Sequence, residues 1–211
     1  PLAAQNCGTG TTMSNQFLGG NGQNGNMFDI AIGAADMTIE CLDINHDDGP
    51  GNFFDLNVYS VPVTCIGNET NMAAWTLVAT ATGVESQGAG VPTPVDISGN
   101  GVTFTGGQTY GLYVFSEGGD TSLDSTNGGP TTYIGDDCDL TTQYGAFGPW
   151  GGTFFPREWN GNLYTSTGPA APFFEETFDA GLPSTFTLTN LNMDPATIGW
   201  VAETGNFGAD P

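Results

Sequence analysis

The chain has 211 residues, with 23 Asp and Glu against a single Lys or Arg, which gives a formal net charge of −22 at pH 7. Nucleic acids and anionic membranes are bound through clusters of Lys and Arg, so we expect neither class of partner. Hydrophobic residues make up 38% of the chain and aromatic residues 11%, which is enough for a packed core and excludes a disordered acidic segment.

The composition predicts an all-β protein. The chain holds 33 Gly and 13 Pro together with many Thr and Asn, a composition typical of short strands joined by turns. No apolar run approaches the roughly 18 residues of a membrane helix, so no membrane insertion is expected. The sequence begins at Pro1 without a basic and apolar leader, which we interpret as a mature secreted chain or a piece of a longer one.

Alternation of apolar and polar residues predicts the strands in chain order. Residues 27–32, 53–60 and 75–81 each alternate, and the expected inward-facing sets are Phe28, Ile30 and Ile32, then Phe54, Leu56 and Val58, then Trp75, Leu77, Ala79 and Ala81. Residues 109–116 are apolar at nearly every position, which predicts a central strand covered on both faces. Shorter candidates are residues 37–44, 102–105, 131–135 and 162–166. Strands of this kind predict an antiparallel β-sandwich that is jelly-roll-like.

The chain is expected to divide near its end. Residues 1–167 would form the sandwich, and residues 168–172 read as a short Pro/Ala linker. The tail, residues 173–211, holds three further strand candidates but is too short to bury a core of its own. It would therefore pack on the first domain, pair with another chain, or begin a second domain.

Four cysteines, Cys7, Cys41, Cys65 and Cys138, lie far apart and form no CxxC pair, which argues against a zinc knuckle or a redox motif. We predict two disulfides formed in an oxidising compartment, with three connectivities open. The alternative is a set of four buried free thiols.

Acidic residues predict one metal site. Asp43, Asn45, Asp47 and Asp48 precede a glycine, as in the first half of a calcium loop, so Ca²⁺ is the predicted cofactor. The twelfth position, which supplies the last ligand of such a loop, is Phe54 here, and Asp55, one place further on, could serve instead. The alternative is a turn in which these side chains cap their own backbone. His46, inside this run, is expected to be solvated. Residues 136–139 are either a second calcium site or a solvated loop.

No arrangement of nucleophile and base is visible, so we do not expect an enzyme. Trp150, in a Gly-Pro-Trp-Gly-Gly loop, is the candidate for an exposed ring that stacks on sugars. Arg157 is expected to form a salt bridge and to stack on Trp159. Glycosylation is predicted at Asn68, the asparagine of the Asn-Glu-Thr sequon, and at Ser125 in Asp-Ser-Thr, which resembles a bacterial O-glycosylation motif.

Several of these segments together carry a family resemblance. The segments GQNGNMFDI, FFDLNVY, AAWTLVATATG, VPTPVDI, TFTGGQTYGLYV and GGTFFPREWNGNLY span about Thr11 to Thr165. They resemble a recurring β-sandwich domain of large secreted bacterial surface proteins that carry C-terminal sorting signals. The tail resembles the opening of the jelly-roll cleaved-adhesin and choice-of-anchor modules exported by the type IX secretion system of Bacteroidetes. The resemblance implies a secreted, extracellular or cell-surface location and supplies no catalytic residues.

Two functions follow as hypotheses. The first is an extracellular structural or adhesive protein, the protomer of a polymeric fibre in which residues 173–203 of one copy complete the sheet of the next. The second is a carbohydrate-binding module of a larger secreted surface protein, with Trp150 contacting surface glycans.

Overall fold

The computed structural model describes residue 7 and residues 13–117 and 123–168. Within these residues the chain consists of strands, two 3₁₀ helices and turns, with no α-helix. The strands are β1 (Met13–Ser14), β2 (Asn21–Gln23), β3 (Gly25–Ile32), β4 (Met37–Asn45), β5 (Phe53–Pro62), β6 (Thr76–Glu85), β7 (Pro92–Asp96), β8 (Val102–Phe104), β9 (Thr109–Glu117), β10 (Leu123–Asn127), β11 (Thr132–Ile134), β12 (Cys138–Ala146), β13 (Thr153–Phe154), β14 (Arg157–Glu158) and β15 (Gly161–Thr167). The 3₁₀ helices are η1 (Met72–Ala74) and η2 (Ser98–Asn100).

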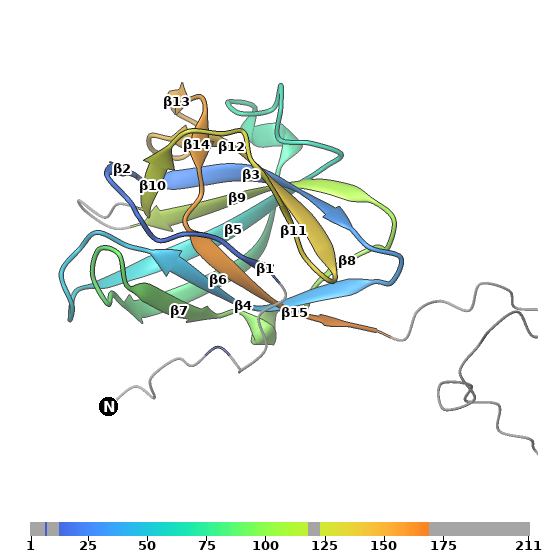
Figure 1. Ribbon diagram of the computed structural model, residues 1–211, viewed down its shortest axis with the longest axis horizontal. Coiled ribbons are helices and arrows are strands. Elements are labelled where there is room, and N and C mark those ends of the chain that lie inside the picture. The colour runs from blue at the N-terminus through green and yellow to red at the C-terminus, as the bar shows by residue number, and fades with distance from the viewer. Residues whose placement is uncertain (1–6, 8–12, 118–122, 169–211) are drawn as a thin grey trace, which may run out of the picture. The chain divides into compact units, whose positions relative to one another are not determined.

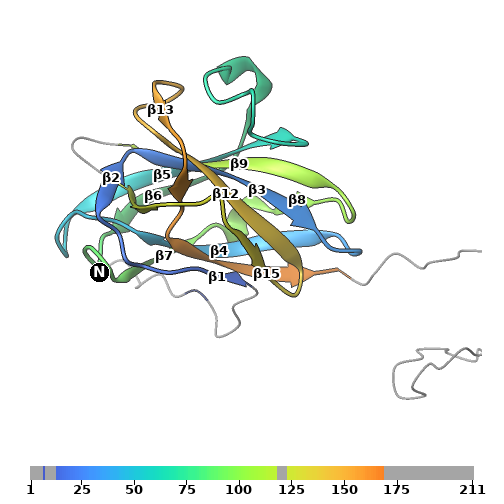
Figure 2. The same cartoon turned by 45° about the horizontal axis from the view of Figure 1, so that its top comes forward.

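The strands form two large sheets and one small one, and all of the described pairings are antiparallel. The seven-stranded sheet has the order β11-β12-β3-β9-β5-β6, with β13 also on β12, and the five-stranded sheet has the order β1-β15-β4-β7, with β8 also on β4. The small sheet is β14-β10-β2. Figures 1 and 2 show the β4–β15 layer and the β3–β9–β5 layer facing each other. The predicted antiparallel β-sandwich is confirmed.

The main core lies between the two large sheets. The inward-facing residues predicted for β3 and β5 all belong to it, with exposures of at most 5%: Phe28, Ile30, Ile32, Phe54, Leu56 and Val58. The opposite layer contributes Leu42 and Ile44 of β4 and Leu163 of β15. Burial of this contiguous apolar set is the main stabilising term of the fold.

A second apolar cluster covers the other face of the seven-stranded sheet. On β9, Leu112 and Val114 face the main core, whereas Tyr113 and Phe115 belong to the second cluster. Trp75 at the end of η1 and Cys65 in the loop after β5 complete its cover. The prediction that this strand is buried on both faces is therefore confirmed, because successive side chains point to opposite faces.

The structure corrects the face predicted for β6. The β5–β6 register shifts between Val58 and Tyr59, so β6 bulges next to Leu77. Because a bulge of one residue reverses the alternation, Leu77 is 51% exposed, Ala79 and Ala81 face the main core, and Trp75 packs in the second cluster. The four residues predicted to share one face therefore lie in three places: Trp75 in the second cluster, Leu77 at the surface, and Ala79 and Ala81 in the main core.

Strand β12 was not predicted, although it is nine residues long and lies between β11 and β3. Its sequence, CDLTTQYGA, has few apolar residues, and its register shifts between Thr142 and Tyr144, so it carries no regular alternation. Tertiary pairing with β3 and not local preference makes this segment a strand.

The predicted linker beyond Gly168 and the tail, residues 173–211, lie outside the described residues. No helix in the described part of the chain is long and apolar enough to cross a membrane.

Candidate functional site

His46 directly follows β4 and is fully buried, so the prediction of a solvated turn residue was wrong. Its ring stacks on that of Phe54, with the centroids 3.9 Å apart and an interplanar angle of 9°. Its Nε2 lies 3.3 Å from Ser116 Oγ, and its backbone forms a β-bridge with Leu123. Burial lowers the pKa of His46 to about 4, against a smaller opposing effect of Asp48, so the ring is neutral at pH 7.

Three consecutive residues, His46, Asp47 and Asp48, form the candidate metal centre. Each offers one ligand atom, and these atoms all lie within 4.8 Å of one another. The imidazole is buried, Asp48 is half-buried and Asp47 is exposed, so the group opens to solvent on one side. Although Asp47 is exposed, its pKa is raised, first because neighbouring protein removes part of the water around its carboxylate and then by the nearby charges of Asp124 and Asp48. The carboxylates of Asp47, Asp48 and Asp124 therefore concentrate negative charge at this place.

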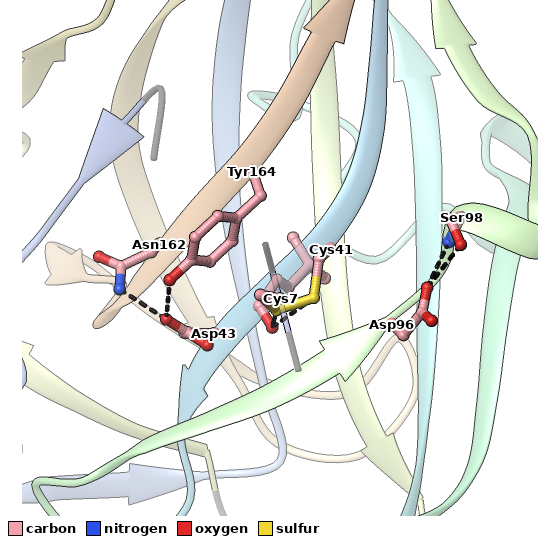
Figure 3. Close-up of a disulfide and its surroundings, with 8 residues drawn as sticks. Cys7, Cys41, Asp43, Asp96, Ser98, Asn162 and Tyr164 are labelled. Atoms are coloured by element: carbon pink, nitrogen blue, oxygen red, sulfur yellow. Dashed lines mark hydrogen bonds between the residues drawn. A yellow bond between two sulfur atoms is a disulfide. The ribbon is translucent and has the colours of Figure 1, made fainter. Parts of the chain in front are cut away.

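The other predicted calcium ligands have different partners. Asp43 lies within β4, where its Oδ2 accepts hydrogen bonds from Asn162 Nδ2 at 2.8 Å and from the Tyr164 hydroxyl at 2.6 Å (Figure 3). Asn45 Oδ1 accepts from the Gly90 backbone N–H at 2.7 Å, and Asp55 Oδ1 accepts from that of Gly83 at 2.8 Å. Of the five predicted ligands, Asp47 and Asp48 belong to the group with His46, and calcium binding by the full set stays a prediction.

The acidic run at residues 136–139 does not form a second group of this kind among the described residues. Asp137 Oδ2 instead accepts a hydrogen bond from Thr165 Oγ1 at 2.6 Å, and Cys138 is buried. Cys138 and Asp139 belong to β12, so the run is only in part a loop, and calcium binding there stays a prediction.

One of the two predicted disulfides is present. Cys7 and Cys41 are bonded, with their Cα atoms 5.4 Å apart, and the bond joins the N-terminal segment to β4 (Figure 3). Cys65 and Cys138 are free and buried, so a second disulfide between them is wrong. The reason is their position: Cys138 lies in the core between the sheets, whereas Cys65 lies on the other face of the seven-stranded sheet.

The chain matches no protein-family model and no curated protein. Its resemblance to bacterial surface proteins therefore stays a prediction, and the function has to be argued from the side chains themselves.

Trp150 is half-buried and belongs to the second apolar cluster, so it is not the exposed ring that was predicted. Its centroid lies 4.9 Å from that of Tyr113, 5.1 Å from that of Tyr59 and 5.3 Å from that of Trp75. Trp75, in turn, donates its indole N–H to the Asn68 carbonyl at 2.8 Å. Packing with three aromatic rings gives Trp150 a structural role.

Exposed rings lie instead on and beside β13. Phe147, Phe154 and Phe155 are 56%, 39% and 55% exposed, and we call them the aromatic surface. Phe147 and Phe154 contact each other edge to face, and Phe155 packs on Tyr144. The Arg157 guanidinium lies 5.5 Å from the Phe154 ring centroid, which corrects the predicted stacking on Trp159. Trp159 is 1% exposed and stacks on Phe28 in the main core.

The two predicted glycosylation sites differ in accessibility. Asn68 is partly exposed, and its side-chain amide donates to the Thr64 carbonyl at 3.2 Å, so its glycosylation stays a prediction. Ser125 is fully buried, accepts a hydrogen bond from Gln23 Nε2 at 2.6 Å and donates to the Asn21 carbonyl at 3.0 Å. An enzyme therefore cannot reach the Ser125 hydroxyl in the folded protein. The prediction of O-glycosylation at Ser125 was wrong.

Proposed function

We propose that this protein is an extracellular structural or adhesive protein whose copies join by strand addition, with residues 173–203 of one copy pairing with an open sheet edge of the next. The observation that carries the proposal is strand β6. It forms one edge of the seven-stranded sheet, pairs with β5 on one side and has no described strand on the other. An edge strand presents backbone N–H and C=O groups to any strand that can reach it.

The composition of β6 lacks the usual protection of an edge. The strand is ten residues long with the sequence TLVATATGVE, so it contains no Lys, Arg or Pro, and its one charge is the terminal Glu85. Natural edges are commonly blocked by such residues. Two register shifts distort the β5–β6 pairing, and Asn100 Oδ1 accepts a hydrogen bond from the Thr80 backbone N–H at 3.3 Å. An added strand would replace that side-chain partner.

The charge pattern supports the same pairing. Copies that each carry −22 repel one another, so contact is favoured where both surfaces are uncharged. The segment STFTLTN, residues 184–190, is uncharged and alternates, and it lies in the tail outside the described residues. Of the predicted tail strands it is the one that best matches the uncharged part of β6.

Extracellular placement rests on the Cys7–Cys41 disulfide. Structural disulfides form and persist in oxidising compartments and are rare in the reducing cytosol. The scarcity of Lys and Arg also agrees with a protein that works away from nucleic acid.

The test compares two single variants, each of which places one positive charge on a different edge of the seven-stranded sheet. Leu77→Lys alters exposed residue 77 of β6, and Ile134→Lys alters Ile134 of β11, which is 76% exposed on the opposite edge. Light scattering and negative-stain microscopy of the full-length chains should show assemblies for the native chain and for Ile134→Lys, and monomers for Leu77→Lys and for a chain ending at residue 167. Assemblies that survive both the truncation and Leu77→Lys would sink the proposal.

Carbohydrate binding is the second candidate, and the aromatic surface favours it. Flat exposed rings stack on the apolar faces of sugars, and Phe147, Phe154 and Phe155 offer such rings within a small area. Glycan-array binding should then be lost on Phe155→Ala and kept on Phe53→Ala, a ring that is equally exposed on β5. Equal binding by the two variants would argue against this candidate.

A further inference from the structure

We propose that His46, Asp47 and Asp48 bind a divalent transition-metal ion such as Zn²⁺, with the imidazole Nδ1 and the two carboxylates as its protein ligands. The group opens to solvent at Asp47, so water would complete the coordination. This site differs from the predicted calcium loop in its ligands and in the class of metal.

The orientation of the His46 ring is the first argument. The ring is held flat against Phe54, and its Nε2 lies beside Ser116 Oγ, so the ring cannot turn without losing both contacts. A neutral imidazole has one N–H and one lone pair. When Nε2–H donates to Ser116 Oγ, the lone pair of Nδ1 is directed away from Ser116. The sheet therefore fixes a metal-binding nitrogen in advance, as a hydrogen bond to the other ring nitrogen does in many metal sites.

The unpaired Nδ1 is the second argument, and it is independent of the acidic residues. Nδ1 is buried and has no hydrogen-bond partner among the residues that the structure describes. Buried polar atoms of this kind are uncommon because each costs roughly 1–3 kcal/mol. The atom facing it is Asp48 Oδ2, 4.0 Å away, which is too far for a hydrogen bond. A cation between them, about 2.0–2.2 Å from each ligand atom, would pair both.

The nature of the ligands decides the class of metal. Ca²⁺ takes 6–8 oxygen ligands, and the oxygens of Asp43 and Asp55 have partners elsewhere. One imidazole nitrogen with two carboxylates is instead a set that suits Zn²⁺, Mn²⁺ and related ions. Two positive charges would also offset the repulsion among Asp47, Asp48 and the nearby Asp124.

A metal here would link separate parts of the chain. His46 is bridged to Leu123 at the start of β10, and Phe54 lies on β5, so the ion would sit where the β4–β5 turn meets β10. Asp124, the next residue of β10, accepts hydrogen bonds from the Gly20 and Asn21 backbone N–H groups at 3.0 and 2.8 Å. Binding at this junction would stabilise the folded chain in proportion to metal concentration.

The test uses the fact that His46 is the single histidine of the chain. Full-length protein labelled with ¹⁵N-histidine and stripped with EDTA is titrated with Zn²⁺ and, separately, with Ca²⁺, and the imidazole nitrogen signals are followed by NMR. One equivalent of Zn²⁺ should move the Nδ1 signal and raise the melting temperature, whereas Ca²⁺ should leave Nδ1 unmoved. Zn²⁺ binding that leaves Nδ1 unmoved, or no Zn²⁺ binding at all, would overturn the proposal.

Two matched variants distinguish coordination of Zn²⁺ at this site from nonspecific attraction of the cation to the acidic surface. Asp48→Asn removes one ligand, and Asp136→Asn removes an exposed acid from the run at 136–139 with the same change in charge. Zn²⁺ affinity should fall by about tenfold or more in Asp48→Asn and stay unchanged in Asp136→Asn, since even outer partners of metal ligands are worth about that much. Circular dichroism checks that both variants are folded, and equal affinities in the two variants would contradict the proposal.

Discussion

Gly111 of β9 lies directly against the backbone of Cys65, so close that a methyl group at position 111 would come within 2.4 Å of the Cys65 nitrogen. The same nitrogen donates a hydrogen bond to Asp29 Oδ1 at 2.7 Å, and so the loop after β5 is held tightly on the outer face of β9. This close approach is where the second apolar cluster meets the sheet.

Gly111→Ala should therefore destabilise the fold. The added methyl group clashes with backbone, which cannot rotate away as a side chain would, so we expect a loss of about 1–3 kcal/mol in the free energy of unfolding. Gly99→Ala is the control, because a methyl group at Gly99 would meet no atom within 4 Å. Urea unfolding measures both, and equal midpoints for the two variants would contradict the packing described.

Thiol chemistry should detect two free cysteines. Burial is the largest of the causes that raise the pKa of the Cys65 and Cys138 thiols, so both stay protonated and unreactive in the folded protein at pH 8. Alkylation followed by mass spectrometry should label neither residue in the native protein and both in denaturant, with Cys7 and Cys41 labelled only after reduction. If the denatured chain has no free thiol, the structure is wrong on this point and the sequence-based prediction of two disulfides is right.

Removing the Cys7–Cys41 bond should lower stability. Replacing both residues with Ser removes a covalent cross-link between residues 34 positions apart in the sequence. The expected loss in the free energy of unfolding is about 2–4 kcal/mol. A reducing agent should lower the melting temperature of the native chain and leave that of the double variant unchanged. If both respond equally, the loss arises from another thiol.

Alkaline pH should weaken the fold through Cys138. Burial first, then the charges of Asp137 and Asp139, raises the pKa of this thiol from its ordinary value of 9.0 to about 12. The folded chain thus holds a proton that the unfolded chain releases, so the stabilisation is complete below pH 9 and is lost as pH rises toward 12.

The size of this effect can be measured by subtraction. Between pH 9 and about pH 10.5 the thiol should cost about 2 kcal/mol of stability. Cys138→Val removes the loss of stability that this thiol causes at alkaline pH. Burial also raises the pKa values of Cys65 and Tyr113, so these two groups still lower the stability of the variant at alkaline pH. Urea unfolding at the two pH values should show a smaller loss for the variant, and identical losses would refute the assignment to Cys138.

Local sequence patterns were sufficient for the class of fold and for much of the core. Alternation is a local property, and it placed Phe28, Leu56 and Tyr113 on their observed faces because side chains in a strand must point to opposite sides in turn. The pattern was misleading at β6, where a bulge reverses it, and it was absent from β12, where pairing with β3 makes the strand.

The composition by itself determined the strong negative charge, the scarcity of cations and the capacity for a core, since these depend on residue types alone. The tertiary structure decided which cysteines pair, which aromatic rings are exposed and that His46 is buried beside Asp48. Each of these depends on contacts between residues far apart in the chain. His46 is buried because β5 brings Phe54 against its ring and β9 brings Ser116 to its Nε2. The residues next to His46 in the sequence do not indicate either contact.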